Sequence, residues 1–146
     1  MVENVSDLPE AYQQELNRLA YEAQGYNDQI KAMQSQLGAL QAAAGDLRSA
    51  LEALRNLSKA KEGVFVPLGA GVLVNAKLTD SDKAMVDVGA GFIAEKKVSE
   101  AIDLLDSRME KTEAAIEDVQ KAIGQATEHL NGLDARAKEI LDKGGK

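Results

Sequence analysis

Two long stretches with a heptad pattern of apolar residues flank a short stretch rich in strand-forming residues and glycine. The first runs from about residue 9 to 61 and the second from about 96 to 142, while residues 64–95 contain two Gly-Ala-Gly turns. Such a chain leaves as one helix, turns through a small sheet and returns as a second helix. Because this shape encloses no pocket, we expect its function to lie in contacts with other chains.

The first stretch predicts a coiled-coil helix. Apolar residues recur at alternating spacings of three and four from Leu16 to Leu54, with no proline after Pro9 to interrupt them. Pro9 suits the first turn of this helix and Asp7 its N-cap. A helix inside a compact domain is the alternative, but 146 residues leave no other layer to cover so long a helix.

The second stretch carries a matching pattern from Val98 to Ile140, and the reversal of the chain makes the two helices antiparallel. When Leu54 is set against Ile102, every apolar position of the first stretch meets an apolar or near-apolar residue of the second. The layer of Ala44 and Thr112, beside Gly45, is the thinnest. We therefore predict one register, which a pairing offset by a heptad would contradict.

The same register leaves apolar side chains at the free helix ends without an intramolecular partner. Val2, Val5 and Leu8 lie beyond the paired positions, Tyr12 faces Gly144, and Leu141 lies beside the seam. Exposed apolar groups on an acidic chain suggest contact with another apolar surface. The alternative is a disordered terminus with a few stray apolar residues.

The middle stretch predicts two β-hairpins that repeat about twenty residues apart. Val64–Leu68 and Val72–Leu78 flank Gly69-Ala-Gly71, and Lys83–Val88 and Phe92–Glu95 flank Gly89-Ala-Gly91. Isolated hairpins are barely stable, and open strand edges pair with other strands. We expect the sheet to be completed by other subunits; a small monomeric sheet over the helix ends is the alternative.

Motifs for catalysis or cofactor binding are weak. Gly89, Gly91 and Ala94 match a dinucleotide fingerprint, but Phe92 and Ile93 continue as strand where a helix should begin. His129 is the sole histidine, on the outer flank of the second helix, and cysteine is absent, which excludes the usual zinc sites. Carboxylates such as Asp103, Asp106, Glu110, Glu113 and Glu117 follow an exposed helical face as solubilising charges and i,i+4 partners of residues such as Lys121. We expect no enzyme, no cofactor and no metal.

Composition narrows the class of partner. The net charge of -7 disfavours nucleic acid and anionic membranes as partners, because both need a basic face. The N-terminus lacks the pattern of a signal peptide, and no stretch approaches the ~18 apolar residues of a membrane span. A cytoplasmic location fits these features and the absence of cysteine.

The hairpin segment resembles a known family. Val66-Pro-Leu-Gly-Ala-Gly-Val72 and Val86-Asp-Val-Gly-Ala-Gly-Phe-Ile-Ala-Glu-Lys96, set between two coiled-coil helices, are similar to prefoldin, in its archaeal alpha-subunit class, because beta subunits carry a single hairpin. The resemblance covers essentially the whole chain, which makes residues 1–146 one prefoldin-like domain. It implies a mainly α fold with a small β part, in which two hairpins join a long antiparallel coiled coil and contribute to an oligomeric β-barrel.

The resemblance also implies a function. Two alpha and four beta subunits would form a hexamer that captures unfolded client proteins at the coiled-coil tips without ATP and passes them to a group II chaperonin. The residues that would contact clients are Val2, Val5, Leu8, Tyr12, Ile140 and Leu141. The residues that would assemble the hairpins are Val64, Phe65, Val66, Leu68, Val72, Val74, Leu78, Met85, Val86, Val88, Phe92 and Ile93.

Other classes of function remain alternatives. A structural coiled-coil spacer would self-assemble but have no affinity for unfolded chains. A tentacled periplasmic holdase would need a signal sequence and a basic chain, and a tRNA-binding helical arm is likewise disfavoured by the acidic charge.

Overall fold

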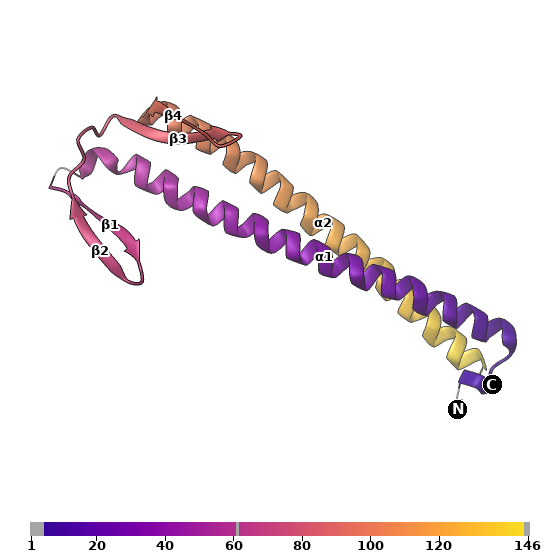
Figure 1. The fold of residues 1–146 in the computed structure, drawn as a ribbon. Coiled ribbons are helices and arrows are strands. Elements are labelled where there is room, and N and C mark those ends of the chain that lie inside the picture. The colour runs from indigo at the N-terminus through magenta and orange to yellow at the C-terminus, as the bar shows by residue number, and fades with distance from the viewer. Residues whose placement is uncertain (1–4, 61, 145–146) are drawn as a thin grey trace. The chain divides into compact units, whose positions relative to one another are not determined.

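The expected order of elements is present in the structure, a computed structural model that describes residues 5–60 and 62–144. The elements are a 3-10 turn at Val5–Asp7, α1 at Glu10–Arg55, a 3-10 turn at Leu57–Lys59, β1 at Val64–Gly69, β2 at Val72–Ala76, β3 at Lys83–Gly89, β4 at Phe92–Lys97 and α2 at Val98–Gly144 (Figure 1). The predicted mainly α fold with two joined hairpins is confirmed. The oligomeric barrel stays a prediction.

Two compact units make up the chain. The terminal unit contains residues 1–41 and 115–146, and the hairpin unit contains residues 42–114. The boundary falls a few residues from the thin Ala44–Thr112 layer on both helices. The assignment of 1–146 as one domain stays a prediction.

In the terminal unit the predicted seam is buried along both helices. Leu19, Val119, Ala126 and Ile140 are buried, and the remaining seam side chains are half-buried. A Cβ built on Gly144 lies 3.7 Å from Cδ2 of Tyr12, the pair that the register sets face to face. Next to the Tyr26 layer, the rings of Tyr26 and His129 stack 5.4 Å apart. The register is confirmed at these layers.

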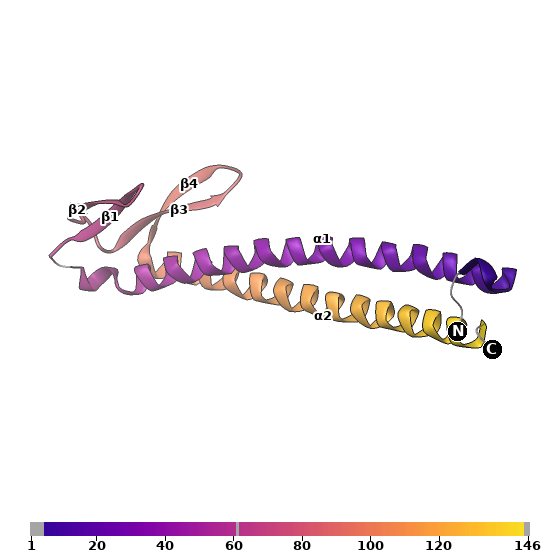
Figure 2. The ribbon, with the colours of Figure 1, turned by 90° about the horizontal axis from the view of Figure 1, so that it is seen from below.

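In the hairpin unit the seam continues to Leu54 and then α1 stops. Leu51 and Leu105, a predicted pair, are both buried, and Arg55 forms an ion pair with Asp106 at 2.9 Å. The side-chain amide of Asn56 donates to the carbonyl of Glu52, so the chain leaves the helix there and not near residue 61 as expected. Figure 2 shows both hairpins leaving this end of the helices.

The N-terminal end differs from the sequence prediction. Asp7 lies in the 3-10 turn and Pro9 precedes the first helical residue, with its carbonyl accepting from the backbone N–H of Gln13. The Gln13 side-chain amide donates to the carbonyls of Ser6 and Leu8, at 3.1 and 2.7 Å. Asp7 is therefore not the N-cap, because Leu8 and Pro9 separate it from Glu10, where α1 begins.

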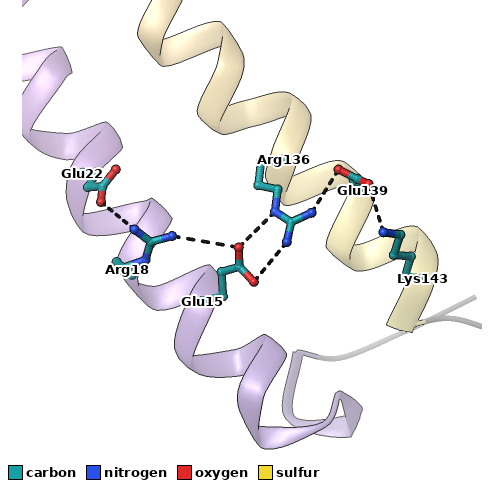
Figure 3. Close-up of polar contacts among 6 residues, drawn as sticks. All are labelled: Glu15, Arg18, Glu22, Arg136, Glu139 and Lys143. Carbon is teal, nitrogen blue, oxygen red and sulfur yellow. Dashed lines mark hydrogen bonds and ion pairs between the residues drawn. The ribbon is translucent and has the colours of Figure 1, made fainter.

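A chain of ion pairs among six charged residues lies beside the seam in the terminal unit (Figure 3). The pair between Arg136 and Glu15 connects α2 with α1, and the other pairs lie within one helix. Nε of Arg136 on α2 lies 3.0 Å from Oε1 of Glu15 on α1, and its Nη1 lies 3.1 Å from Glu139. Arg18, Glu22 and Lys143 extend the chain of ion pairs at both ends. Hydrogen bonds from Lys143 and then Arg136 lower the pKa of Glu139, and those to Glu15 and Glu139 raise the pKa of Arg136.

The two hairpins have the same turn. Ala70 and Ala90 adopt φ of 52° and 53°, and the following Gly71 and Gly91 adopt 80° and 79°. Both central residues of each turn are left-handed, as in a type I′ hairpin turn, and a bulge precedes each turn at Gly69 or Gly89. The predicted repeat is confirmed in three dimensions. β4 continues directly from this turn as strand, so the glycines do not open a nucleotide-binding helix.

Within the part of the chain that the structure describes, neither helix is apolar enough over a sufficient length to cross a membrane.

Replacing Gly38 or Gly45 by alanine should stabilise the protein. A Cβ at either position meets no atom within 4 Å, so only the helix propensity changes, by about 1 kcal/mol each. Thermal melting followed by circular dichroism should show the gain. Gly71→Ala is the control and should give no such gain, because Gly71 adopts a φ of 80° that residues with a side chain rarely adopt. Equal gains at all three positions would contradict this assignment.

Glu139→Gln should lower the melting temperature at neutral pH but not in acid. Ion pairs lower the pKa of Glu139, so their stabilisation is present above the ordinary glutamate pKa and is lost as the pH falls through the folded value. Melting curves at pH 7 and pH 3, in low and high salt, measure this difference. Glu128→Gln, at an exposed carboxylate of the same helix, is the control. A Glu139→Gln effect that persists at pH 3 would point to packing as the cause.

Candidate functional site

The first hairpin, β1 with β2, has exposed apolar side chains on both faces, although its end pair, Val64 and Ala76, is half-buried. Side chains directly opposite each other share a face, so Phe65 and Asn75 lie with Pro67 and Leu73, while Val66 and Val74 lie on the other face. Phe65 is 71% exposed and Leu73 58%; Val66 and Val74 are each 40% exposed. This hairpin therefore presents apolar surface in two directions.

The second hairpin, β3 with β4, is covered on one face by its own chain. Val86 is buried, and Ala84, Ala94 and Lys96 on the same face are half-buried. Arg108 of α2 donates to the backbone carbonyl of Asp87 at 2.6 Å, and the N–H of Val98 donates to the carbonyl of Asp82. These bonds hold β3 against the first turns of α2, where Ala101 is fully buried.

The other face of the second hairpin is open and mixed. Met85 and Ile93 are 66% and 65% exposed, and the charged residues Asp87 and Glu95 share their face. Each hairpin is a separate two-stranded sheet, so each has open strand edges. Open strand edges can pair with strands of another subunit, and the apolar faces beside them can be buried in the same contact.

Most of the residues predicted to assemble are available for contact. Those exposed are Phe65, Val66, Leu68, Val72, Val74, Leu78, Met85, Val88, Phe92 and Ile93, whereas Val64 is half-buried. Val86 is a correction, because it already packs within its own chain. Leu73 is an addition that the prediction missed; its alternation with Val72 and Val74 could have revealed it, since both faces of the strand are apolar.

At the free helix ends, part of the predicted client-contact set is wrong, because two of its residues are buried. Leu8 is 3% exposed and Ile140 1%, so these side chains are not open apolar contacts. Val5 and Leu141 are exposed, at 46% and 38%, and Tyr12 is half-buried. Val2 lies outside the described residues. The role of the exposed pair in binding stays a prediction.

Leu8 is buried because the chain reverses before α1. The 3-10 turn at Val5–Asp7 brings Leu8 against Gly144 and Tyr12, where the missing side chain of Gly144 leaves room for it. The heptad count extended the helical period beyond Pro9 and so placed Leu8 opposite nothing. A residue after a turn can instead cover the end of the seam.

A hollow of about 370 Å³ opens beside this seam in the terminal unit. Small side chains, Ala20, Ala23 and Ala137, alternate with leucines around it, and the exposed Val5 and Leu141 contribute to its edge. The remaining lining residues are Leu16, Asn17, Leu19, Leu133 and Asp134. An apolar side chain of a partner could enter here without any change in the helices.

Groups that carry chemistry do not converge in the described residues. No cluster of three or more His, Asp or Glu side chains is placed to hold a metal ion in residues 5–60 and 62–144. His129 lies on the exposed flank as expected, although its ring also stacks on Tyr26. Glu117 pairs with Lys121 at 3.2 Å, as the i,i+4 spacing predicts.

Comparison with known proteins identifies the same architecture. The family described as "Prefoldin subunit" matches residues 26–143. Prefoldin subunit alpha of Pyrococcus horikoshii is 31% identical over 132 residues, covering 88% of this chain and 89% of that protein. Prefoldin subunit alpha of Methanocorpusculum labreanum is 31% identical over 133 residues, covering 90% of each.

A solved structure agrees with these relatives. The cryo-EM structure of filamentous PFD from Methanocaldococcus jannaschii resembles this chain with a TM-score of 0.66 at 28% identity, covering 80% of this chain and 99% of that one. The resemblance inferred from the two Gly-Ala-Gly hairpins is thus confirmed. This chain belongs to the prefoldin family, whose subunits are components of a chaperone and not enzymes.

Proposed function

We propose that this chain is a subunit of an ATP-independent holdase that captures unfolded polypeptides at its coiled-coil tip and delivers them to a group II chaperonin. The observation that carries the proposal is the distribution of exposed large apolar side chains. Among the described residues they lie on the hairpins with the adjoining Leu78, and at the helix ends, with Tyr21 as the exception. Between their ends the described helices expose no other large apolar side chain.

The hairpins supply the assembly contacts of this proposal. Open edges accept partner strands and the open faces accept a second layer, as in a closed barrel. The resemblance to prefoldin implies a hexamer of two such chains with four single-hairpin beta subunits, and the name of the relatives, prefoldin subunit alpha, supports the alpha class of this chain.

The helix ends supply the client contacts. The hollow beside Val5 and Leu141 takes an apolar side chain but has only two polar residues in its lining, so it selects by hydrophobicity and not by sequence. Several tips around one unfolded chain would bind it with an avidity far above that of each tip. Because each single contact is weak, the client can be released to a chaperonin. The proposed location of this transfer is the cytoplasm.

A structural assembly without client binding is the second candidate. The similar chain from Methanocaldococcus jannaschii is described as filamentous PFD, which supports an extended assembly as the alternative. A spacer of this kind needs the hairpins but not the exposed tip. The two candidates therefore differ in the effect of substitutions at Val5 and Leu141.

Replacing both Val5 and Leu141 by serine should weaken suppression of client aggregation several-fold and leave assembly intact. Both side chains are exposed, so their loss removes binding surface at little cost in stability. Light scattering of a chemically denatured client, diluted into the co-expressed assembly, measures capture. Leu8→Ala is the control, and should instead lower stability by roughly 2 kcal/mol because Leu8 is buried. Full capture by the serine variant would favour the spacer.

Replacing Val72 and Val74 by aspartate should abolish assembly with a single-hairpin partner. Both residues are exposed on β2, and burying two carboxylates in an apolar contact costs several kcal/mol. Native mass spectrometry should show the loss of the complex, while circular dichroism reports unchanged helix content. Tyr21→Asp is the matched control, because Tyr21 is also exposed but lies on α1, far from β2 in the sequence. Complexes of unchanged mass in the aspartate variant would refute the hairpins as the assembly module.

A further inference from the structure

The chain before α1 folds back over the free end of the seam. The 3-10 turn at Val5–Asp7 lies beside the end of α2 in both ribbon views (Figures 1 and 2). Leu8 follows this turn, lies against Gly144 and is 3% exposed. Residues 5–8, the N-terminal cover, therefore occupy the end of the seam that the heptad pattern leaves open.

The burial of Ile140 shows how far the N-terminal cover reaches. Ile140 is 1% exposed, less than any other large side chain among the described residues, although it lies one layer from the free end. Two helices alone leave most seam side chains half-buried. The described residues of the terminal unit outside α1 and α2 are residues 5–9, and Val5 lines the hollow together with Leu16, the register partner of Ile140. The cover thus completes the burial of this layer.

A glutamine of α1 fastens the N-terminal cover. The side-chain amide of Gln13 donates to the carbonyls of Ser6 and Leu8, and the backbone N–H of Leu8 donates to the carbonyl of Val5 at 3.1 Å. Val5, Ser6 and Asp7 are exposed, so Leu8 is the one buried side chain of the cover. A short turn with a single buried side chain belongs to the parts of a fold that open while the rest stays folded.

The N-terminal cover has the chemistry of the segments that the tip is proposed to bind. In Val5-Ser-Asp-Leu8, two polar residues separate two apolar ones, and the segment forms neither a long helix nor a strand. It contacts the end of the seam through the apolar side chain of Leu8, as a short stretch of unfolded chain would. A client segment and the cover are therefore alternatives for the same apolar surface.

We propose that the N-terminal cover is a built-in competitor of clients, which closes over the last layers of the seam and opens for full capture. This inference rests on the proposed function and adds a regulation to it. In the closed state Val5 and Leu141 are exposed to a client, and opening adds Tyr12 and Ile140. The apparent affinity for a client is then reduced in proportion to the fraction of tips that are open.

Gln13→Glu should open the N-terminal cover. A carboxylate of the same length cannot donate to the carbonyls of Ser6 and Leu8. The assembly with this variant should bind a fluorescently labelled, permanently unfolded client several-fold more tightly in anisotropy titrations. Gln14→Glu, the same change of charge at the exposed neighbour, is the matched control and should leave the affinity unchanged. Equal affinities of Gln13→Glu and the unsubstituted chain would overturn the inference.

A disulfide between the N-terminal cover and α2 should have the opposite effect. A Cβ built on Gly144 lies 3.5 Å from Cγ of Leu8, which puts cysteines at these positions within reach of each other, and the chain has no cysteine of its own. The double variant Leu8→Cys with Gly144→Cys should bind the same client several-fold more weakly when oxidised than when reduced. Equal affinity of the two forms, with the disulfide verified by mass spectrometry, would make the cover a permanent part of the seam.

Opening of the N-terminal cover can also be measured without a client. Ile140→Cys should react with a maleimide faster in the Gln13→Glu background than in the Gln14→Glu background. Ala126→Cys, buried in the seam several layers away, is the control and should react at the same slow rate in both. Absence of client binding by the unsubstituted assembly would refute the proposed function, whereas equal labelling of Ile140→Cys in the two backgrounds would refute the cover.

Discussion

Burial of an alternating apolar seam between α1 and α2 is the interaction on which the remaining structure depends. Apart from the first turns of α2, which lie against β3, neither helix has another layer to cover its apolar stripe, so each depends on the other for its stability. In both units the seam side chains are buried or half-buried along their length. The hairpins begin where the seam ends at Leu54, and the exposed apolar side chains at the other helix end lie beside its last layers.

Because the seam uses the apolar side chains of the helices, the surface of those helices is free to be polar. The ion pairs from Arg136 to Glu15 and from Arg55 to Asp106 connect α2 with α1 beside the seam. Such exposed pairs each stabilise the pairing of the helices only slightly. Apolar surface is concentrated instead on the hairpins and the helix ends. This separation puts the surface that we propose for assembly and the surface that we propose for client capture on different parts of one small chain.

Periodicity in the sequence was sufficient for the helices, their register and the two hairpins, because each repeat is local and long. It could not place Leu8, since the 3-10 turn that returns this residue to Gly144 interrupts the period. It also could not separate the hairpins, whose sequences are nearly repeated. The second hairpin differs by its long-range contacts: Arg108 donates to the carbonyl of Asp87, Val98 donates to the carbonyl of Asp82, and Val86 is buried. Sequence spacing does not reveal these contacts.

The exposed apolar side chains on both faces of the first hairpin affect how much of this subunit a cell can hold without its partners. A protomer without partners carries exposed Phe65, Leu73, Val66 and Val74 next to open strand edges, which is the surface pattern of an aggregation-prone segment. Its stability is then tied by mass action to the concentration of its partners. A cell that makes this subunit in excess of its partners would accumulate protomers with exposed apolar surface, the kind of surface that a holdase binds. The fold therefore favours synthesis of this subunit in proportion to its partners.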